Sequence, residues 1–124
     1  MVIVQSKNSS TILLIGSDRT LGYLLKRYAE RSGYRLVARE KVPSVSEIMP
    51  IDPVVIVFLS TEILETTQVL VRQLASLDAL IMLCSSVSDE AKARELGADY
   101  CLVHPLTYDA FQSVLTRGGV RNPV

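Results

Sequence analysis

Cys84 and His104 are the residues whose types most readily suggest chemistry in this chain. Each stands at the carboxyl end of a predicted strand, and neighbouring parallel strands would bring the thiol and the imidazole to one edge of a sheet. A thiolate activated by imidazole would be a nucleophile or a redox centre. The sequence shows no third group to orient the imidazole and no oxyanion motif. We therefore interpret Cys84 as a small core residue and His104 as a turn residue, and predict that the protein is not an enzyme.

A second possible site is a crevice at the same sheet edge, where polar groups could bind a small molecule without catalysing anything. Its residues would be Gly16, Ser17, Asp18, Ser60, Ser85, Ser86 and His104. The segment from Gly16 to Gly22, GSDRTLG, is neither a GxGxxG nor a Walker motif. We interpret it as a tight turn with close packing, so no nucleotide cofactor is predicted.

The composition argues against several classes of function. The 124 residues suffice for one domain, and the 13 basic and 13 acidic residues cancel, so no overall field favours nucleic acid or an anionic membrane. Cys84 and Cys101 lack the CxxC spacing of zinc sites and predict free thiols in a reducing cytosol. No apolar run approaches the roughly 20 residues of a membrane span. We expect a cytoplasmic protein with no metal, no membrane contact and no nucleic-acid partner.

The elements that position these residues follow from hydrophobic patterning. The stretch 53–60, PVVIVFLS, is the most apolar of the chain and predicts a central strand buried on both faces. Asp18, Ser60 and Thr107 are well placed to cap helices. Further strands are predicted at 11–15, 34–39, 79–84 and 101–103, and helices at 19–32, 61–76, 86–96 and 107–115, with at most a short helix within 43–50.

This alternation of strands and helices specifies the fold class. Parallel strands need crossovers, which helices supply, so we predict an α/β fold: a doubly wound five-stranded parallel sheet in the order 2-1-3-4-5 within a three-layer sandwich. Residues 1–10 are expected to form an N-terminal arm, 11–117 the domain and 118–124 a flexible tail.

The segment from Gly97 to Leu106, GADYCLVHPL, resembles the Gly-Ala-Asp, strand, Lys-Pro segment near the end of response regulator receiver domains, the CheY-like family. The spacing of the other strands agrees, so the resemblance covers about residues 11–115. It implies a flavodoxin-like or CheY-like sandwich and a part in two-component signal transduction or a phosphorelay. Receivers take phosphate from a histidine kinase onto an aspartate beside magnesium, and relay the change through the face built by their last two helices.

Carried over residue by residue, the resemblance finds no phosphoacceptor. That position aligns with Leu59, or with Phe58 if the alignment slips by one residue, and neither side chain can accept phosphate. The acidic pair that holds magnesium aligns with Gly16 and Ser17, while Asp18 stands one place too late. A hard dication needs several oxygen ligands, so magnesium binding is not expected here.

The remaining receiver positions have also changed. The hydroxyl residue aligns with Cys84, with Ser85 beside it, and the lysine before the proline is His104. The aromatic switch position falls on Cys101, with Tyr100 displaced onto the preceding position. Together these changes indicate a degenerate receiver, or pseudo-receiver.

The predicted function is therefore signalling by protein–protein interaction independent of phosphorylation, with another signalling protein or with a second copy of the chain as a homodimer. The alternative is small-molecule binding in the crevice described above. The resemblance places the interaction face on the last helix pair and strand. Its residues would be Lys92, Arg94, Glu95, Tyr100, Cys101, Tyr108, Asp109 and Gln112.

Overall fold

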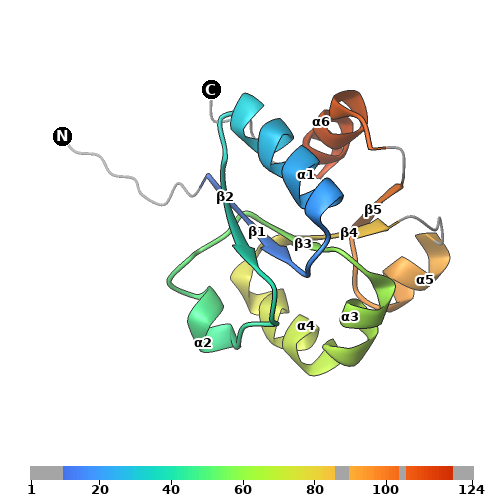
Figure 1. Cartoon of the computed structure of the whole chain (residues 1–124). Coiled ribbons are helices and arrows are strands. Elements are labelled where there is room, and N and C mark those ends of the chain that lie inside the picture. Colours follow the sequence, from blue (N-terminus) through green and yellow to red (C-terminus); the bar gives the residue numbers. More distant parts are fainter. Residues whose placement is uncertain (1–9, 86–89, 104–105, 119–124) are drawn as a thin grey trace.

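Five parallel strands form one sheet in the computed structural model, which describes residues 10–85, 90–103 and 106–118 (Figure 1). The strands are β1 (Thr11–Ile15), β2 (Arg35–Arg39), β3 (Val55–Phe58), β4 (Leu80–Ser85) and β5 (Tyr100–Val103). Their order is β2-β1-β3-β4-β5, and every neighbouring pair is parallel. The predicted sheet and its strand order are confirmed.

Helices cover both faces of the sheet, which confirms the predicted three layers (Figure 1). One face carries α1 (Arg19–Arg31) and α6 (Tyr108–Arg117). The other carries α2 (Val45–Ile48), α3 (Thr61–Thr66), α4 (Gln68–Leu74) and α5 (Glu90–Glu95), and a short 3-10 helix, η1 (Ala75–Leu77), follows α4. Within the described ranges, none of these helices is long and apolar enough to cross a membrane.

The central strand β3 is buried on both faces, as its unbroken apolar run predicts. Val55 and Val57 point into the core beneath α1 and α6, whereas Ile56 and Phe58 point into the core on the other face. All four side chains are fully buried, so β3 separates and contributes to two hydrophobic cores. At the sheet edge, β2 is partly exposed along its whole length, in keeping with its more polar sequence.

The predicted caps are confirmed at three helices. Asp18 Oδ1 accepts from Leu21 N at 3.0 Å at the start of α1, and Ser60 Oγ accepts from Ile63 N at 3.1 Å at the start of α3. Thr107 Oγ1 likewise accepts from Ala110 N at 3.1 Å, opening α6. Each cap satisfies one of the amide groups that have no partner within the first turn of a helix.

The prediction of a single helix over 61–76 is wrong, because the helix is interrupted at Thr67 and forms two helices, α3 and α4. Thr67 lies outside the helical region, at φ −119° and ψ 30°, and its hydroxyl donates to Ile63 O at 2.7 Å. The Gln68 side-chain amide then donates to Leu64 O at 2.9 Å. These side chains donate to carbonyl groups that would otherwise accept backbone hydrogen bonds from the next turn of the helix. As a result, α3 ends early.

Some sequence expectations fall outside the described residues. The predicted helix start at 86–89 is one of them, and the described part of that helix, α5, begins at Glu90. Residues 1–9 and 119–124, which belong to the expected arm and tail, also lie outside.

Candidate functional site

Gly16 and Leu59 meet at the carboxyl ends of β1 and β3, the edge where receiver-like folds would do their chemistry. Gly16 has φ +129°, and a Cβ built on it would lie only 2.8 Å from Leu59 Cβ. The Gly16 amide donates to Arg39 O at 2.9 Å, and the Leu59 amide donates to Ile15 O at 3.0 Å. Backbone pairing therefore continues one residue past both strands, and the two residues are packed in direct contact.

The position predicted for the phosphoacceptor is filled by apolar side chains. Phe58 is fully buried and packs in the core on the α2–α5 face of the sheet. Leu59 is 7% exposed and packs beneath α1 and α6. Neither side chain carries an oxygen, and both are committed to the hydrophobic cores.

The polar residues predicted to line the crevice at this edge are only partly brought together. Asp18 Oδ1 and Ser60 Oγ cap α1 and α3, and Ser17 is exposed to solvent. Ser85 ends β4 opposite Val103 in the sheet register. Ser86 and His104 lie outside the described residues. Among residues 10–85, 90–103 and 106–118, no three histidine, cysteine, aspartate or glutamate side chains gather to hold a metal ion.

Cys84 is fully buried, in the core beneath α1 and α6. Burial, with smaller contributions from nearby Cys101 and Asp18, raises the pKa of its thiol from 9.0 to about 12. A thiol with such a pKa is protonated at neutral pH and is a poor nucleophile. This environment supports the interpretation of Cys84 as a core residue.

Neither cysteine forms a disulfide, and the two lie on opposite faces of the sheet. In the register of β4 and β5, Cys84 is opposite Leu102, and Cys101 is opposite Leu83. Cys84 belongs to the core beneath α1 and α6, whereas Cys101 packs against the core on the α5 face. Because adjacent positions along a strand point to opposite faces, the two sulfur atoms cannot form a disulfide in this fold.

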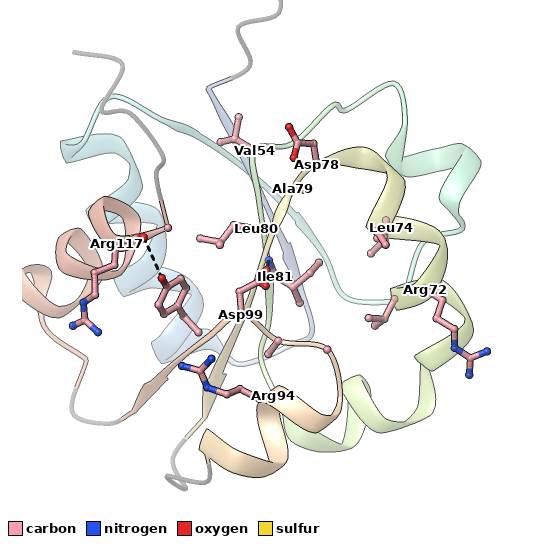
Figure 2. A pocket seen from close by; sticks show the side chains of 16 residues that line it. Val54, Arg72, Leu74, Asp78, Ala79, Leu80, Ile81, Arg94, Asp99 and Arg117 are labelled. Atoms are coloured by element: carbon pink, nitrogen blue, oxygen red, sulfur yellow. Dashed lines mark hydrogen bonds between the residues drawn. The ribbon is translucent and has the colours of Figure 1, made fainter.

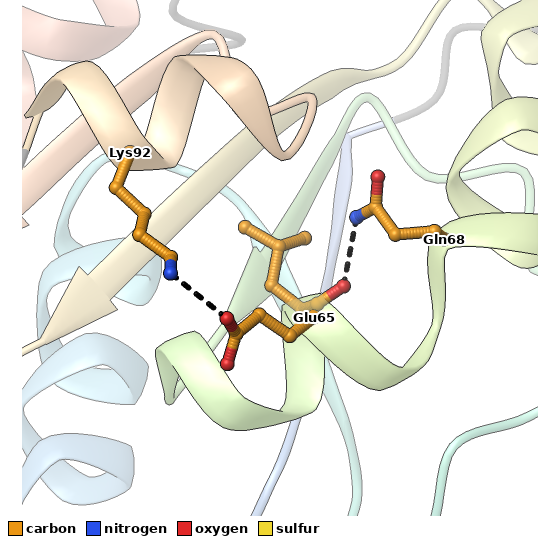
Figure 3. Close-up of polar contacts among 4 residues, drawn as sticks. Glu65, Gln68 and Lys92 are labelled. Atoms are coloured by element: carbon orange, nitrogen blue, oxygen red, sulfur yellow. Dashed lines mark hydrogen bonds and ion pairs between the residues drawn. The ribbon is translucent and has the colours of Figure 1, made fainter.

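The predicted interaction face divides between solvent-facing and internally bonded residues. On α5, Lys92, Arg94 and Glu95 are exposed. Lys92 Nζ lies 3.0 Å from Glu65 Oε2 and links α5 to α3 (Figure 3). Asp109, in the first turn of α6, is exposed as well.

Tyr108 and Gln112, also predicted for this face, are engaged with α1. The Gln112 side-chain amide donates to Ser32 Oγ and to the Tyr108 hydroxyl, both at 2.6 Å. The Arg31 guanidinium lies 4.1 Å from the centroid of the Tyr108 ring. The hydrogen bond with Ser32 is the main cause of a lowered pKa of the Tyr108 phenol. Their polar groups thus fasten α6 to α1.

Asp99, the acid of the GAD segment, has a structural role that the sequence did not reveal. Its carboxylate accepts from Ile81 N at 2.8 Å, and its own amide donates to Ile81 O at 2.7 Å. Asp99 thereby extends the pairing of β4 beyond the start of β5. The next residue, Tyr100, donates its hydroxyl to Arg117 O at 3.1 Å and so ties β5 to α6.

An open hollow of about 1200 Å³ lies at the opposite edge of the sheet, around the amino ends of β4 and β5 (Figure 2). Sequence reasoning missed it, because its lining comes from segments far apart in the chain. Two local sequence features contribute to its lining: Asp78, which follows η1 with φ 58°, and the GAD segment that contains Asp99.

Comparisons with known proteins were made at the levels of sequence and structure. No protein-family model matches the chain, and no curated protein matches its sequence. Solved structures do match. A response regulator from Thermotoga maritima superposes with a TM-score of 0.73 at 13% identity, covering 89% of this chain and 97% of that one.

Two further similar structures belong to orphan regulators. HP1043, an orphan response regulator of H. pylori, gives a TM-score of 0.71 at 18% identity and covers 94% of this chain and 100% of its own. An atypical orphan response regulator, described as having a phosphorylation-independent regulatory mechanism, gives 0.72 at 17% identity, covering 90% and 98%. The chain therefore has the receiver-domain fold.

Proposed function

We propose that the protein is a receiver-like signalling module that acts through protein–protein contacts and does not accept phosphate. The observation that carries this proposal is the pairing of Leu59 with Gly16 at the end of β3. An aspartyl phosphate needs a carboxylate nucleophile with charge neutralisation around it. Here Phe58 and Leu59 carry buried hydrocarbon side chains. The backbone of Gly16 lies so close to Leu59 that a side chain on Gly16 would clash with it.

The residues at the end of β1 are also poorly suited to bind magnesium. Asp18 is the first acidic residue in the chain after β1, and one of its oxygens is held by the first turn of α1. A single carboxylate that already caps a helix is a weak site for a cation that prefers six oxygen ligands. The similarity to a regulator described as phosphorylation-independent supports the same interpretation by analogy of fold.

Binding rather than catalysis is the expected activity. The neutral, buried Cys84 offers no nucleophile, which supports a module without enzymatic function. The partner would be another signalling protein or a second copy of the chain, meeting exposed groups of α5 and α6 such as Arg94, Glu95 and Asp109. A cytoplasmic location remains the prediction, and two cysteines that form no disulfide are compatible with it.

The direct test is incubation with acetyl phosphate and magnesium, followed by intact-mass measurement. We expect no gain in mass, with a receiver that has a phosphoacceptor aspartate as the positive control. A stoichiometric gain of one phosphoryl group that hydroxylamine removes would overturn the proposal. Purification of the protein from its native cell, followed by identification of the proteins bound to it, would then name the partner.

A further inference from the structure

The hollow at the amino ends of β4 and β5 has an apolar lining and a charged rim. This apolar lining comes from both faces of the sheet: Val54 and Leu80 are half-buried against the core beneath α1 and α6, whereas Leu74 and Ala98 are buried in the core on the other face. Leu80 also meets Gly118, where α6 ends. The hollow thus lies between the end of α4 and the end of α6 and is open to solvent (Figure 2).

Three arginines border the hollow. Arg72 stands on α4 and Arg94 on α5, on one face of the sheet (Figure 2). Arg117 stands at the end of α6, on the other face, and its guanidinium also donates to Ser113 Oγ at 3.1 Å. All three are exposed, and in the part of the chain that the structure describes none of them forms a salt bridge. Two carboxylates also line the hollow, so its formal charge is 3 − 2 = +1 in a chain whose net charge is zero.

The two carboxylates do not neutralise the arginines directly. Asp99 is bound to the amide of Ile81, and Asp78 lies at the far end of η1. Because Asp99 already satisfies that amide, a ligand could not add to β4 by backbone pairing there. Recognition would therefore depend on side chains: apolar groups against the apolar lining and acidic groups against the guanidinium groups.

We infer that this hollow is the docking site for an acidic, partly apolar peptide segment of the partner protein. Small-molecule sites usually enclose about 300–1000 Å³ and bury most of the ligand, whereas this hollow is larger and open. Nucleic acid fits less well, since its binding depends on contacts to several phosphates, whereas the hollow carries a formal charge of only +1 and has apolar lining. This inference rests on the proposed function and deepens it, because it names a surface and the chemistry of the partner.

Selection from a library of random octapeptides displayed on phage tests the inference without a known ligand. The peptides recovered on the wild-type protein should be enriched in aspartate, glutamate and aliphatic residues. The affinity of the consensus peptide, measured by fluorescence anisotropy, should fall about tenfold in each of the variants Arg94→Glu and Arg72→Glu. Arg19→Glu, the same charge change at the start of α1 and at the opposite edge of the sheet, should leave the affinity unchanged.

Several results would overturn the docking site. These are failure to recover peptides, recovery of basic or uncharged ones, equal affinity in all three variants, or tighter binding of an oligothymidylate of similar length. The two substituted arginines are exposed on different helices, so loss of folding in one variant leaves the other for the measurement. The acetyl phosphate experiment is scored separately. If the protein binds peptide and is also phosphorylated, only the proposed function is refuted. If it does not bind peptide and is not phosphorylated, only the docking site is refuted.

Discussion

Leu59 occupies the space that any side chain on Gly16 would need, since the two Cβ positions would be only 2.8 Å apart. Gly16 also has φ +129°, a conformation that residues with a Cβ rarely adopt. Glycine is thus required at position 16 for two reasons: the backbone conformation, and the lack of room for a side chain. The contact joins the first and third strands at the edge where a receiver would need room for metal and phosphate.

The variant Gly16→Ala should be strongly destabilised. We expect its free energy of unfolding to fall by about 2–4 kcal/mol, because backbone strain and steric overlap act together. Gly22→Ala is the matched control: the nearest atom to a Cβ there is Leu14 Cδ2 at 3.8 Å, within the interior of α1. It should stabilise the protein by about 0.5–1 kcal/mol. Urea unfolding measures both, and equal effects of the two substitutions would contradict this account of Gly16.

Cys84 should make the stability of the protein depend on alkaline pH. Its thiol has a pKa of about 12 in the folded state, against 9.0 for an ordinary thiol. The folded state holds this proton more tightly, so the contribution is complete below pH 9 and is lost as the pH rises from about 9 to 12, at up to about 1.4 kcal/mol per pH unit. Tyr34, whose pKa burial raises to about 12, adds a similar loss above its ordinary value of 10.0.

Urea unfolding across this pH range separates the two groups. Cys84→Ala should be less stable than wild type by about 1 kcal/mol at neutral pH, because of the space left in the core. That difference should shrink above pH 9, since only the wild-type protein loses the Cys84 contribution. Val57→Ala, a truncation in the same core that removes no titratable group, is the control and should keep a constant difference. A Cys84→Ala difference that stays constant to pH 11 would refute the raised pKa.

The sheet could be predicted from sequence because each strand carries a local signal. The run from Val55 to Phe58 is apolar at every position, and such a run, short and rich in β-branched residues, favours a strand covered on both faces over a buried helix. The caps were equally local, since Asp18 and Ser60 act within three residues of themselves. The proposal that the chain lacks a phosphoacceptor also rests on local information, namely which residues end and follow the strand.

Features that depend on distant contacts could not be predicted in this way. The break at Thr67 is reinforced by Gln68, whose side chain also donates to Leu96 O at 2.8 Å across the fold. The engagement of Gln112 with α1 depends on Ser32, eighty residues earlier in the chain. The hollow depends on the way α4, α6 and the ends of two strands leave space between them. None of these contacts has a periodic or compositional signature.

Asp99 should contribute to stability through its bond to the Ile81 amide rather than through its charge. Asp99→Ala leaves that amide without its side-chain acceptor, and we expect the free energy of unfolding to fall by about 1–3 kcal/mol. Asp99→Asn keeps a carbonyl oxygen in the same place and should recover most of the loss. Thermal and urea unfolding of the two variants decide the point. An asparagine variant as unstable as the alanine variant would show that the negative charge itself is what matters.

The ion pair between Lys92 and Glu65 should contribute little to stability, although it links α5 to α3 (Figure 3). Both side chains are nearly half exposed, at 44% and 45%, so water and salt screen the attraction. A double-mutant cycle with Lys92→Ala and Glu65→Ala should give a coupling energy of about 0.2–1 kcal/mol at low salt, and less in 1 M sodium chloride. The pair Lys26 and Glu30, 3.9 Å apart on α1, is the comparison and should couple still more weakly. A Lys92–Glu65 coupling well above this range that survives high salt would mean that the pair is shielded from solvent, and Lys92 would then have to be removed from the predicted interaction face.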